Sequence, residues 1–227
     1  MKTILCLVAV LFCSVGLAAD EVVYSLDFTT QPDGSALPWL KQRGFENKLG
    51  FEKLDPQFKS GALWLSTQRP ETGVCGIVFP KGGDLLGAKR LRLTWGATAL
   101  PAGADFERGV SRMALGVLVS FGREKLPSGL PLGVFAAPYF LCPYLCAKEP
   151  ERKVYIGKYW KTGGRYIAVN NGKPGDTLVS EFDLDRLFEA AFKKTPTPAV
   201  SAISIQMNTK DTAGKASAFI KKIEFLR

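Results

Sequence analysis

The stretch Met113–Phe121, with the sequence MALGVLVSF, places apolar side chains at every second position from Leu115 onward. Successive side chains of a β-strand point to opposite faces, so this spacing predicts a strand with one face against a core. A second stretch, Ser201–Met207, repeats the alternation, with isoleucines and a methionine between polar residues. The two stretches therefore predict a sheet that buries one side.

Further short runs rich in strand-forming residues extend in both directions from these two, and Gly, Pro, Asn and Asp separate them. These runs are Val22–Phe28, Ala62–Ser66, Cys75–Phe79, Arg90–Trp95, Val154–Tyr159, Arg165–Val169, Thr177–Phe182 and Ala218–Leu226. One segment, Leu184–Phe192, has apolar residues at helical spacing and follows Asp183, which is placed to cap the helix. We therefore predict a single all-β domain, a jelly-roll β-sandwich with one short amphipathic helix.

The amino-terminal segment predicts export. Lys2 precedes a short apolar run, and Gly16 and Ala18 occupy the two small positions before a cleavage site. We expect residues 1–18 to be a signal peptide and residues 19–227 to work in the periplasm or outside the cell. No stretch of the sequence has the 18 or so continuous apolar residues of a membrane-spanning helix.

Composition narrows the chemistry. The chain has 227 residues, a formal net charge of +9 and no histidine. The usual general base at neutral pH is therefore missing, and with it every Ser-His or Cys-His nucleophile. Carboxylate-pair chemistry and calcium binding stay open, but we expect no cofactor, no catalytic residue and no metal site. The positive charge favours anionic partners, and the lack of a basic stripe argues against nucleic acid.

Three cysteines lie beyond the predicted leader, at Cys75, Cys142 and Cys146. In an oxidising compartment two of them would pair and leave one free thiol. Any pairing is open, although Pro143 constrains a bond between Cys142 and Cys146. The alternative, three small buried side chains, is equally open.

From about Arg90 to its end the chain resembles a bacterial domain-of-unknown-function family, number 3047, of secreted or periplasmic proteins. The resemblance rests on the order of Leu91–Trp95, the acidic loop Asp105 to Glu107, Arg112 to Phe121, Glu181–Leu184 before the helix, Pro198–Ile203, Asn208 to Thr212 and Ile220 to Phe225. It implies a jelly-roll similar to carbohydrate-binding modules and no assigned reaction. The turn Asn208–Thr212 departs from the family's acidic pattern because it contains Lys210.

Aromatic side chains make the strongest candidate site, since apolar rings stack on sugar rings. The segment Phe135–Tyr144 contains two prolines, which predicts a long apolar loop rather than an inner strand. Tyr139 and Tyr144 would then contact a ligand, unless the loop folds back and buries its rings. A hairpin tip at Trp160 carries the other candidates, Trp160, Arg165 and Tyr166, and Arg165 suits a ligand carboxylate or phosphate.

Charged side chains make a second set: Asp105, Glu107, Glu181 and Asp211, with Arg112 as an organiser. Arg112 and Glu181 belong either to a ligand site or to a buried structural ion pair with each other. Nothing in the linear spacing brings two carboxylates together, so no catalytic pair is assigned.

The leading hypothesis is a non-catalytic extracytoplasmic protein that binds a glycan or another cell-envelope component. Two alternatives are a polysaccharide-acting enzyme, a glycosidase or lyase without histidine, and a structural partner protein of an envelope complex. Release of reducing ends or unsaturated products would indicate the enzyme. Co-purification with another protein in fixed stoichiometry would indicate the partner protein.

Overall fold

The computed structural model describes residues 20–129, 136–157 and 159–227. The predicted signal peptide, its cleavage site near Ala18 and Phe135 of the aromatic segment lie outside these residues. Among the described residues, no helix has the length and apolar character needed to cross a membrane.

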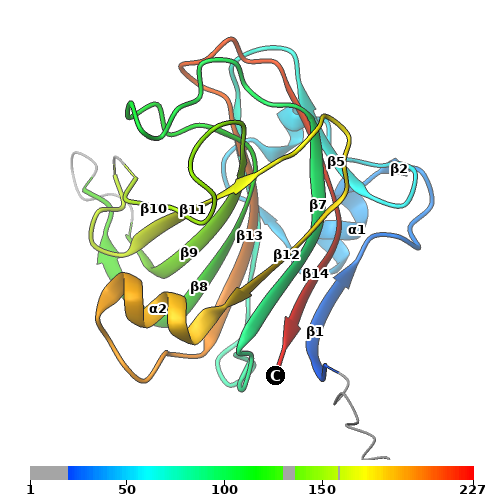
Figure 1. Cartoon of the computed structure of the whole chain (residues 1–227). Coiled ribbons are helices and arrows are strands. Elements are labelled where there is room, and N and C mark those ends of the chain that lie inside the picture. Colours follow the sequence, from blue (N-terminus) through cyan, green and yellow to red (C-terminus); the bar gives the residue numbers. More distant parts are fainter. Residues whose placement is uncertain (1–19, 130–135, 158) are drawn as a thin grey trace, which may run out of the picture.

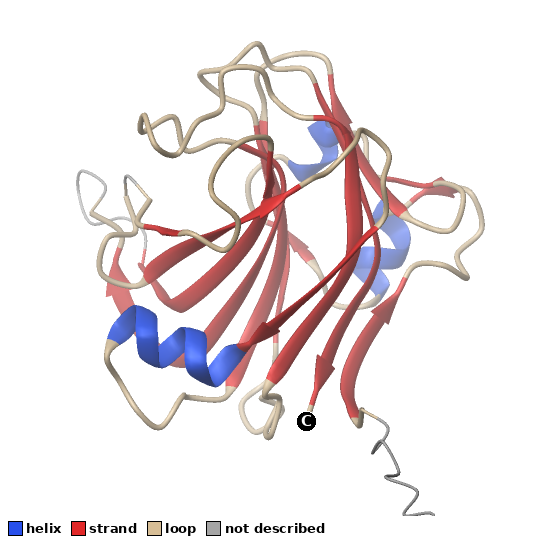
Figure 2. Cartoon of the chain, viewed as in Figure 1, coloured by secondary structure: helices blue, strands red, loops and turns tan. Residues whose placement is uncertain are grey.

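Two sheets pack face to face and confirm the predicted jelly-roll β-sandwich (Figures 1 and 2). Sheet A has the strand order β12-β7-β14-β5-β4-β2, and β1 pairs with β14. Its strands are β1 (Val22–Asp27), β2 (Gly34–Ser35), β4 (Gln57–Phe58), β5 (Leu63–Thr67), β7 (Arg90–Ala99), β12 (Leu178–Asp183) and β14 (Ala216–Leu226).

Sheet B has the order β10-β11-β9-β8-β13-β6-β3. Its strands are β3 (Glu46–Asn47), β6 (Thr72–Val78), β8 (Met113–Pro127), β9 (Ala136–Cys146), β10 (Val154–Tyr155), β11 (Gly164–Asn170) and β13 (Val200–Asn208). Strands β9 and β11 run parallel, whereas the other pairs are antiparallel.

The main core fills the space between the sheets. Leu115, Val117 and Val119 of β8 are fully buried there. Ile203 and Ile205 of the neighbouring strand β13 lie beside Val119 and Val117 and are buried in the same core, which confirms the alternation seen in the sequence. Burial of each such apolar side chain stabilises the fold by about 1.5–3 kcal/mol, and this gain holds the two sheets together.

The predicted helix is present as α2 (Leu184–Phe192), and its first turn is capped as expected. Asp183 accepts a hydrogen bond from the backbone N–H of Arg186 at 2.9 Å. Phe188 is fully buried and contacts Phe121 of β8 and Tyr139 of β9, so α2 crosses one end of sheet B (Figure 1). Two further short helices are α1 (Leu37–Gln42) and the 3-10 helix η1 (Phe51–Leu54).

The proline-containing aromatic segment is an inner strand, so the prediction of an exposed loop was wrong. Strand β9 lies between β8 and β11. Pro138 lies beside the register shift of the β8–β9 ladder, between Tyr139 and Ala137, and has no strand partner among the described residues. Pro143 has no partner in β8 but stands opposite Ile167 of the parallel strand β11. A proline has no N–H to donate, and the β8–β9 ladder has no pair at either position.

Candidate functional site

The fold separates the predicted site residues instead of gathering them. Strand β9 contributes Tyr139 to the face that points between the sheets and Tyr144 to the opposite face, because side chains alternate along a strand. Tyr166 lies with Tyr144, whereas Arg165, its neighbour on β11, lies beside α2. The predicted residues therefore belong to different sites.

The first of these sites is a buried aromatic cluster on the outer face of sheet B, called here the loop cluster. Phe106 from the loop of residues 101–112 stacks on Tyr144, with ring centroids 4.2 Å apart and planes at 27°. The same ring contacts Tyr155 at 5.4 Å and Tyr166 at 5.5 Å. Tyr144 is fully buried and Tyr166 is 9% exposed, so neither can touch a ligand in this conformation. The alternative of self-buried rings is correct for these two tyrosines.

Trp160 lies at the edge of the loop cluster. Its ring is 6.0 Å from that of Phe140, edge to face, and its side chain is half-buried. It is thus partly open to solvent, as the hairpin prediction required, but it supports the cluster from the side.

Matched charges attach the loop of residues 101–112 to the segment of residues 148–155. Lys148 Nζ lies 2.9 Å from Asp105, and Lys153 Nζ lies 2.6 Å from Glu107, which also accepts from the Tyr155 hydroxyl. Lys148 holds the pKa of Asp105 below its usual value, and Lys153, followed by Tyr155, does the same for Glu107. The ionised carboxylates therefore stabilise the closed loop.

Two polar groups are enclosed under this loop. The Glu149 side chain is 3% exposed and accepts a hydrogen bond from the Phe106 backbone N–H at 3.1 Å. The buried Tyr144 hydroxyl has no hydrogen-bond partner among the described residues, and burial raises its pKa. The phenol stays protonated, and the loop cluster serves as a second core.

The predicted pairing of Arg112 with Glu181 was wrong. Arg112 donates from Nε to the Lys210 carbonyl at 2.6 Å and pairs with the Asp211 carboxylate. Glu181 lies on β12, directly opposite Arg92 on β7. Arg112 precedes β8 of sheet B whereas Glu181 lies in sheet A, and each has other partners.

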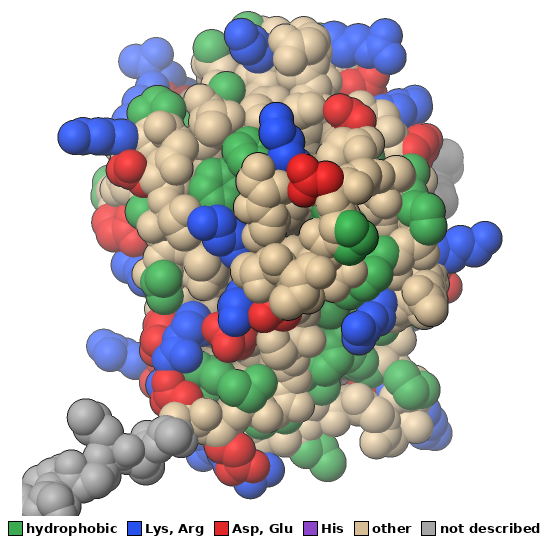
Figure 3. All heavy atoms as spheres, turned by 90° about the vertical axis from the view of Figure 1, so that its right-hand side faces the viewer, with side chains coloured by type: hydrophobic (Ala, Val, Ile, Leu, Met, Phe, Trp, Pro, Cys, Tyr) green, Lys and Arg blue, Asp and Glu red, His purple; other side chains and the backbone are tan. Residues whose placement is uncertain are grey.

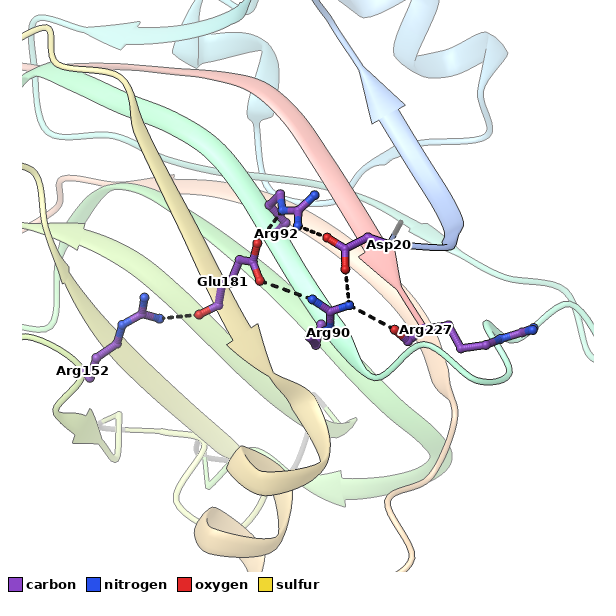
Figure 4. A network of polar contacts seen from close by, with 6 residues as sticks. All are labelled: Asp20, Arg90, Arg92, Arg152, Glu181 and Arg227. Carbon is purple, nitrogen blue, oxygen red and sulfur yellow. Dashed lines mark hydrogen bonds and ion pairs between the residues drawn. The ribbon is translucent and has the colours of Figure 1, made fainter. Parts of the chain in front are cut away.

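Glu181 belongs to a charge network on the outer face of sheet A (Figure 4). Its carboxylate lies 2.6 Å from Arg92 Nε and 3.5 Å from Arg90 Nη1. Asp20 bridges the same two arginines, which lower its pKa, and Arg90 also donates to the Arg227 carbonyl at 3.2 Å. Both signs interleave across this side of the molecule (Figure 3). The network joins the two ends of the described chain and leaves no charge free for a ligand.

The second site is a hollow at the C-terminal end of α2, called here the α2 pocket. Its volume is about 470 Å³, which is within the range of about 300–1,000 Å³ for small-molecule and cofactor sites. It is lined by Phe121, Gly122, Glu124, Tyr139, Lys193, Lys194, Thr195, Pro196 and Pro198. The pocket forms because the chain leaves α2 at Lys193, in the left-handed conformation, and returns past the end of β8.

Cations rest on aromatic rings around the α2 pocket. Lys194 Nζ lies 5.4 Å from the centroid of the Tyr139 ring, and the Arg165 guanidinium lies 4.9 Å from that of Phe192. The Tyr139 and Phe192 rings are 4.8 Å apart. Within residues 20–129, 136–157 and 159–227, no carboxylate forms an ion pair with Arg165, Lys193 or Lys194. This differs from the loop cluster, where Asp105 and Glu107 each have a lysine partner.

Two more hollows adjoin the α2 pocket and share Thr195 with it. One, of about 400 Å³, adds Arg186 and Glu189 to the wall, and the other, of about 380 Å³, adds Asp185 and Leu86. The surface around the turn after α2 is thus concave on several sides. The sequence analysis named Tyr139 and Arg165 as ligand candidates on two separate segments and gave Lys193 and Lys194 no role. The signal that identifies them is a lysine pair between a helix end and a proline-rich turn.

The three cysteines among the described residues, Cys75, Cys142 and Cys146, are free thiols, and all three are buried. Cys142 and Cys146 lie on the same strand four residues apart, which separates their Cα atoms by about 13 Å, too far for a disulfide. Burial raises the pKa of Cys75 to about 11 and that of Cys146 to about 12. Among the described residues, no three acidic, cysteine or histidine side chains are grouped to hold a metal ion.

Comparison with known proteins gives fold-level likenesses only. No protein-family model and no curated protein matches the chain. Similar solved structures include a family 12 xyloglucanase from Bacillus licheniformis, with 8% identity over 90% of this chain and 99% of the other, and a TM-score of 0.45.

Two further solved structures have similar scores. Endoglucanase 3 from Trichoderma harzianum, of family GH12, has 9% identity, coverage of 92% and 99%, and a TM-score of 0.40. A family 11 xylanase from Neocallimastix patriciarum has 10% identity, coverage of 90% and 99%, and a TM-score of 0.38. At these scores none of the three decides what this chain does.

Proposed function

We propose that this protein is a non-catalytic, exported glycan-binding protein that holds its ligand in the α2 pocket. The observation that carries the proposal is the coincidence of aromatic walls and free hydrogen-bond donors around one hollow. The buried rings of Phe121 and Tyr139 form part of the wall, and the half-buried ring of Phe192 lies against Tyr139. The exposed side chains of Lys193 and Lys194 offer ammonium groups that have no acidic partner among the described residues. A sugar needs both kinds of contact, because its C–H face is apolar and its rim carries hydroxyl groups.

Export is part of the same proposal and rests on the leader pattern of residues 1–18. The chain's resemblance to family 3047 of bacterial domains of unknown function supports the same compartment. Recovery of the protein from the periplasm or medium, with a new N-terminus next to Ala18, would support it. Retention of the leader on a cytoplasmic product would contradict it.

The binding test compares two double variants with the same change in net charge. Lys193→Gln with Lys194→Gln removes both ammonium groups of the α2 pocket. Lys81→Gln with Lys173→Gln removes two exposed lysines elsewhere. We expect the first pair to lower retention on a panel of immobilised polysaccharides at least tenfold and the second to change it less than twofold.

The same experiment separates the alternatives. Release of reducing ends or unsaturated products from a retained polysaccharide would show that the protein is an enzyme and would contradict a non-catalytic function. Equal retention of wild type and both double variants would remove the α2 pocket as the site. Failure of a folded wild type to bind any glycan of the panel would overturn the proposed function itself.

A further inference from the structure

Arg165 is an arginine with free donors at the edge of the proposed site. Its Nη1 donates to the carbonyl oxygens of Lys161 at 2.9 Å and Gly164 at 2.8 Å. Its Nε and Nη2 make no hydrogen bond to any residue that the structure describes. Two backbone carbonyls thus hold the guanidinium in place while two of its nitrogens remain available.

The position of Arg165 makes an unpaired charge costly. The side chain is half-buried against the Phe192 ring, and desolvation lowers the pKa of the guanidinium, which nevertheless stays protonated. A cation that has lost part of its hydration and has no counter-ion is stabilised when an anion binds to it. A planar carboxylate matches the remaining donors, because arginine binds it through two parallel N–H···O bonds.

The neighbouring charges point the same way. Beyond the contacting Phe192 and Tyr139 rings lie Lys193 and Lys194 of the α2 pocket, opposed in its lining by Glu124 alone. The cations are spread over one surface, as a polymer with repeated acidic groups requires. The full sequence has a net charge of +9, of which Lys2 in the predicted leader contributes one, and long-range attraction from the remaining positive charge adds to the encounter rate with such a polymer.

We propose that the glycan is acidic, with carboxylate-bearing sugars, and that Arg165 binds one carboxylate while Lys193 and Lys194 face the next along the chain. This inference rests on the proposed function and specifies its ligand class. It assigns Arg165 a specificity role that is distinct from the ring contacts of the α2 pocket.

The test uses full-length mature protein and two matched probes, oligogalacturonate and its methyl ester. The two share ring, linkage and length, and differ in charge. We expect oligogalacturonate to bind at least tenfold more tightly, with an affinity that falls as salt rises. Arg165→Gln should lose about tenfold or more on the acid, the size of one charge-assisted contact, and little on the ester.

Two control variants sharpen the result. Arg43→Gln removes another arginine placed over an aromatic ring, 4.9 Å from the centroid of Trp39, and should leave binding unchanged. Arg165→Lys keeps the charge but not the paired donors, and should recover only part of the loss.

The outcomes separate the two proposals. Equal affinity for acid and ester, or equal effects of Arg165→Gln and Arg43→Gln, overturns the acidic-ligand inference while glycan binding stands. Binding of sulfated dextran but not of oligogalacturonate overturns the claim that the ligand's acidic group is a carboxylate and shows that the site binds sulfate. Absence of binding to any glycan removes the proposed function and this inference together.

Discussion

The loop cluster and the α2 pocket are built from opposite faces of one strand, and they differ in how charge is matched. Tyr144 of β9 lies under Phe106, where Asp105 and Glu107 each have a lysine partner. Tyr139, five residues earlier, lies under Lys194, which has no acidic partner among the described residues. Matched charges over buried rings indicate a structural core, whereas unmatched charges around a surface hollow indicate a place for a ligand. The comparison can be tested from both sides.

The largest effect is expected in the loop cluster. Phe106→Ala removes a ring that is 6% exposed and contacts three tyrosines, and should lower the free energy of unfolding by about 3–5 kcal/mol. Urea denaturation measures the loss, and Val179→Ala, at a residue that is 65% exposed, should stay within about 0.5 kcal/mol. Glycan retention should be unchanged for the folded variant. A loss of stability below about 1 kcal/mol would show that the cluster is not a core.

The helix cap gives the next effect and links stability to the pocket. Asp183→Ala removes the acceptor for the Arg186 N–H and should cost about 1 kcal/mol of unfolding free energy. Asp183→Ser should restore most of it, because serine also caps helices. Thermal denaturation follows the change. Binding should fall less than twofold, since packing of Phe188 still holds α2 in place. A larger loss of binding with intact stability would mean that Asp183 contacts the ligand.

A smaller effect is expected from pH at the loop attachment. Lys153 and Tyr155 lower the pKa of Glu107 in the folded state, so the ionised carboxylate stabilises the fold. That contribution is complete above the unfolded pKa, about 4.3, and disappears as pH falls through the lower folded value. Urea unfolding of wild type and Glu107→Gln should therefore differ at pH 7 and converge toward pH 3. A difference that widens on acidification would have the wrong sign.

The smallest effect concerns thiol chemistry. Burial and raised pKa values, about 11 for Cys75 and about 12 for Cys146, leave little thiolate at pH 8. Ellman's reagent should react slowly with native mature protein and count three thiols after unfolding without reductant. A count of one thiol would require a disulfide, and the β9 geometry would then have to change.

The sequence alone determined the elements that depend on local rules. Alternation from Leu115 to Phe121 specified a strand with one buried face, and Asp183 specified the start of α2. The fold class followed from the number of such strands. These features depend on side-chain direction and capping, which are set within a few residues.

Only the tertiary structure decided which charges meet and which rings line a surface hollow. Arg112 pairs with Asp211 and Glu181 with Arg92, and β9 is an inner strand although it contains two prolines. The α2 pocket joins residues from β8, β9 and the turn after α2, and these residues extend from Phe121 to Pro198 in the chain. Such contacts depend on strand order and register, and the local sequence encodes neither, because each strand satisfies the same alternation with several neighbours.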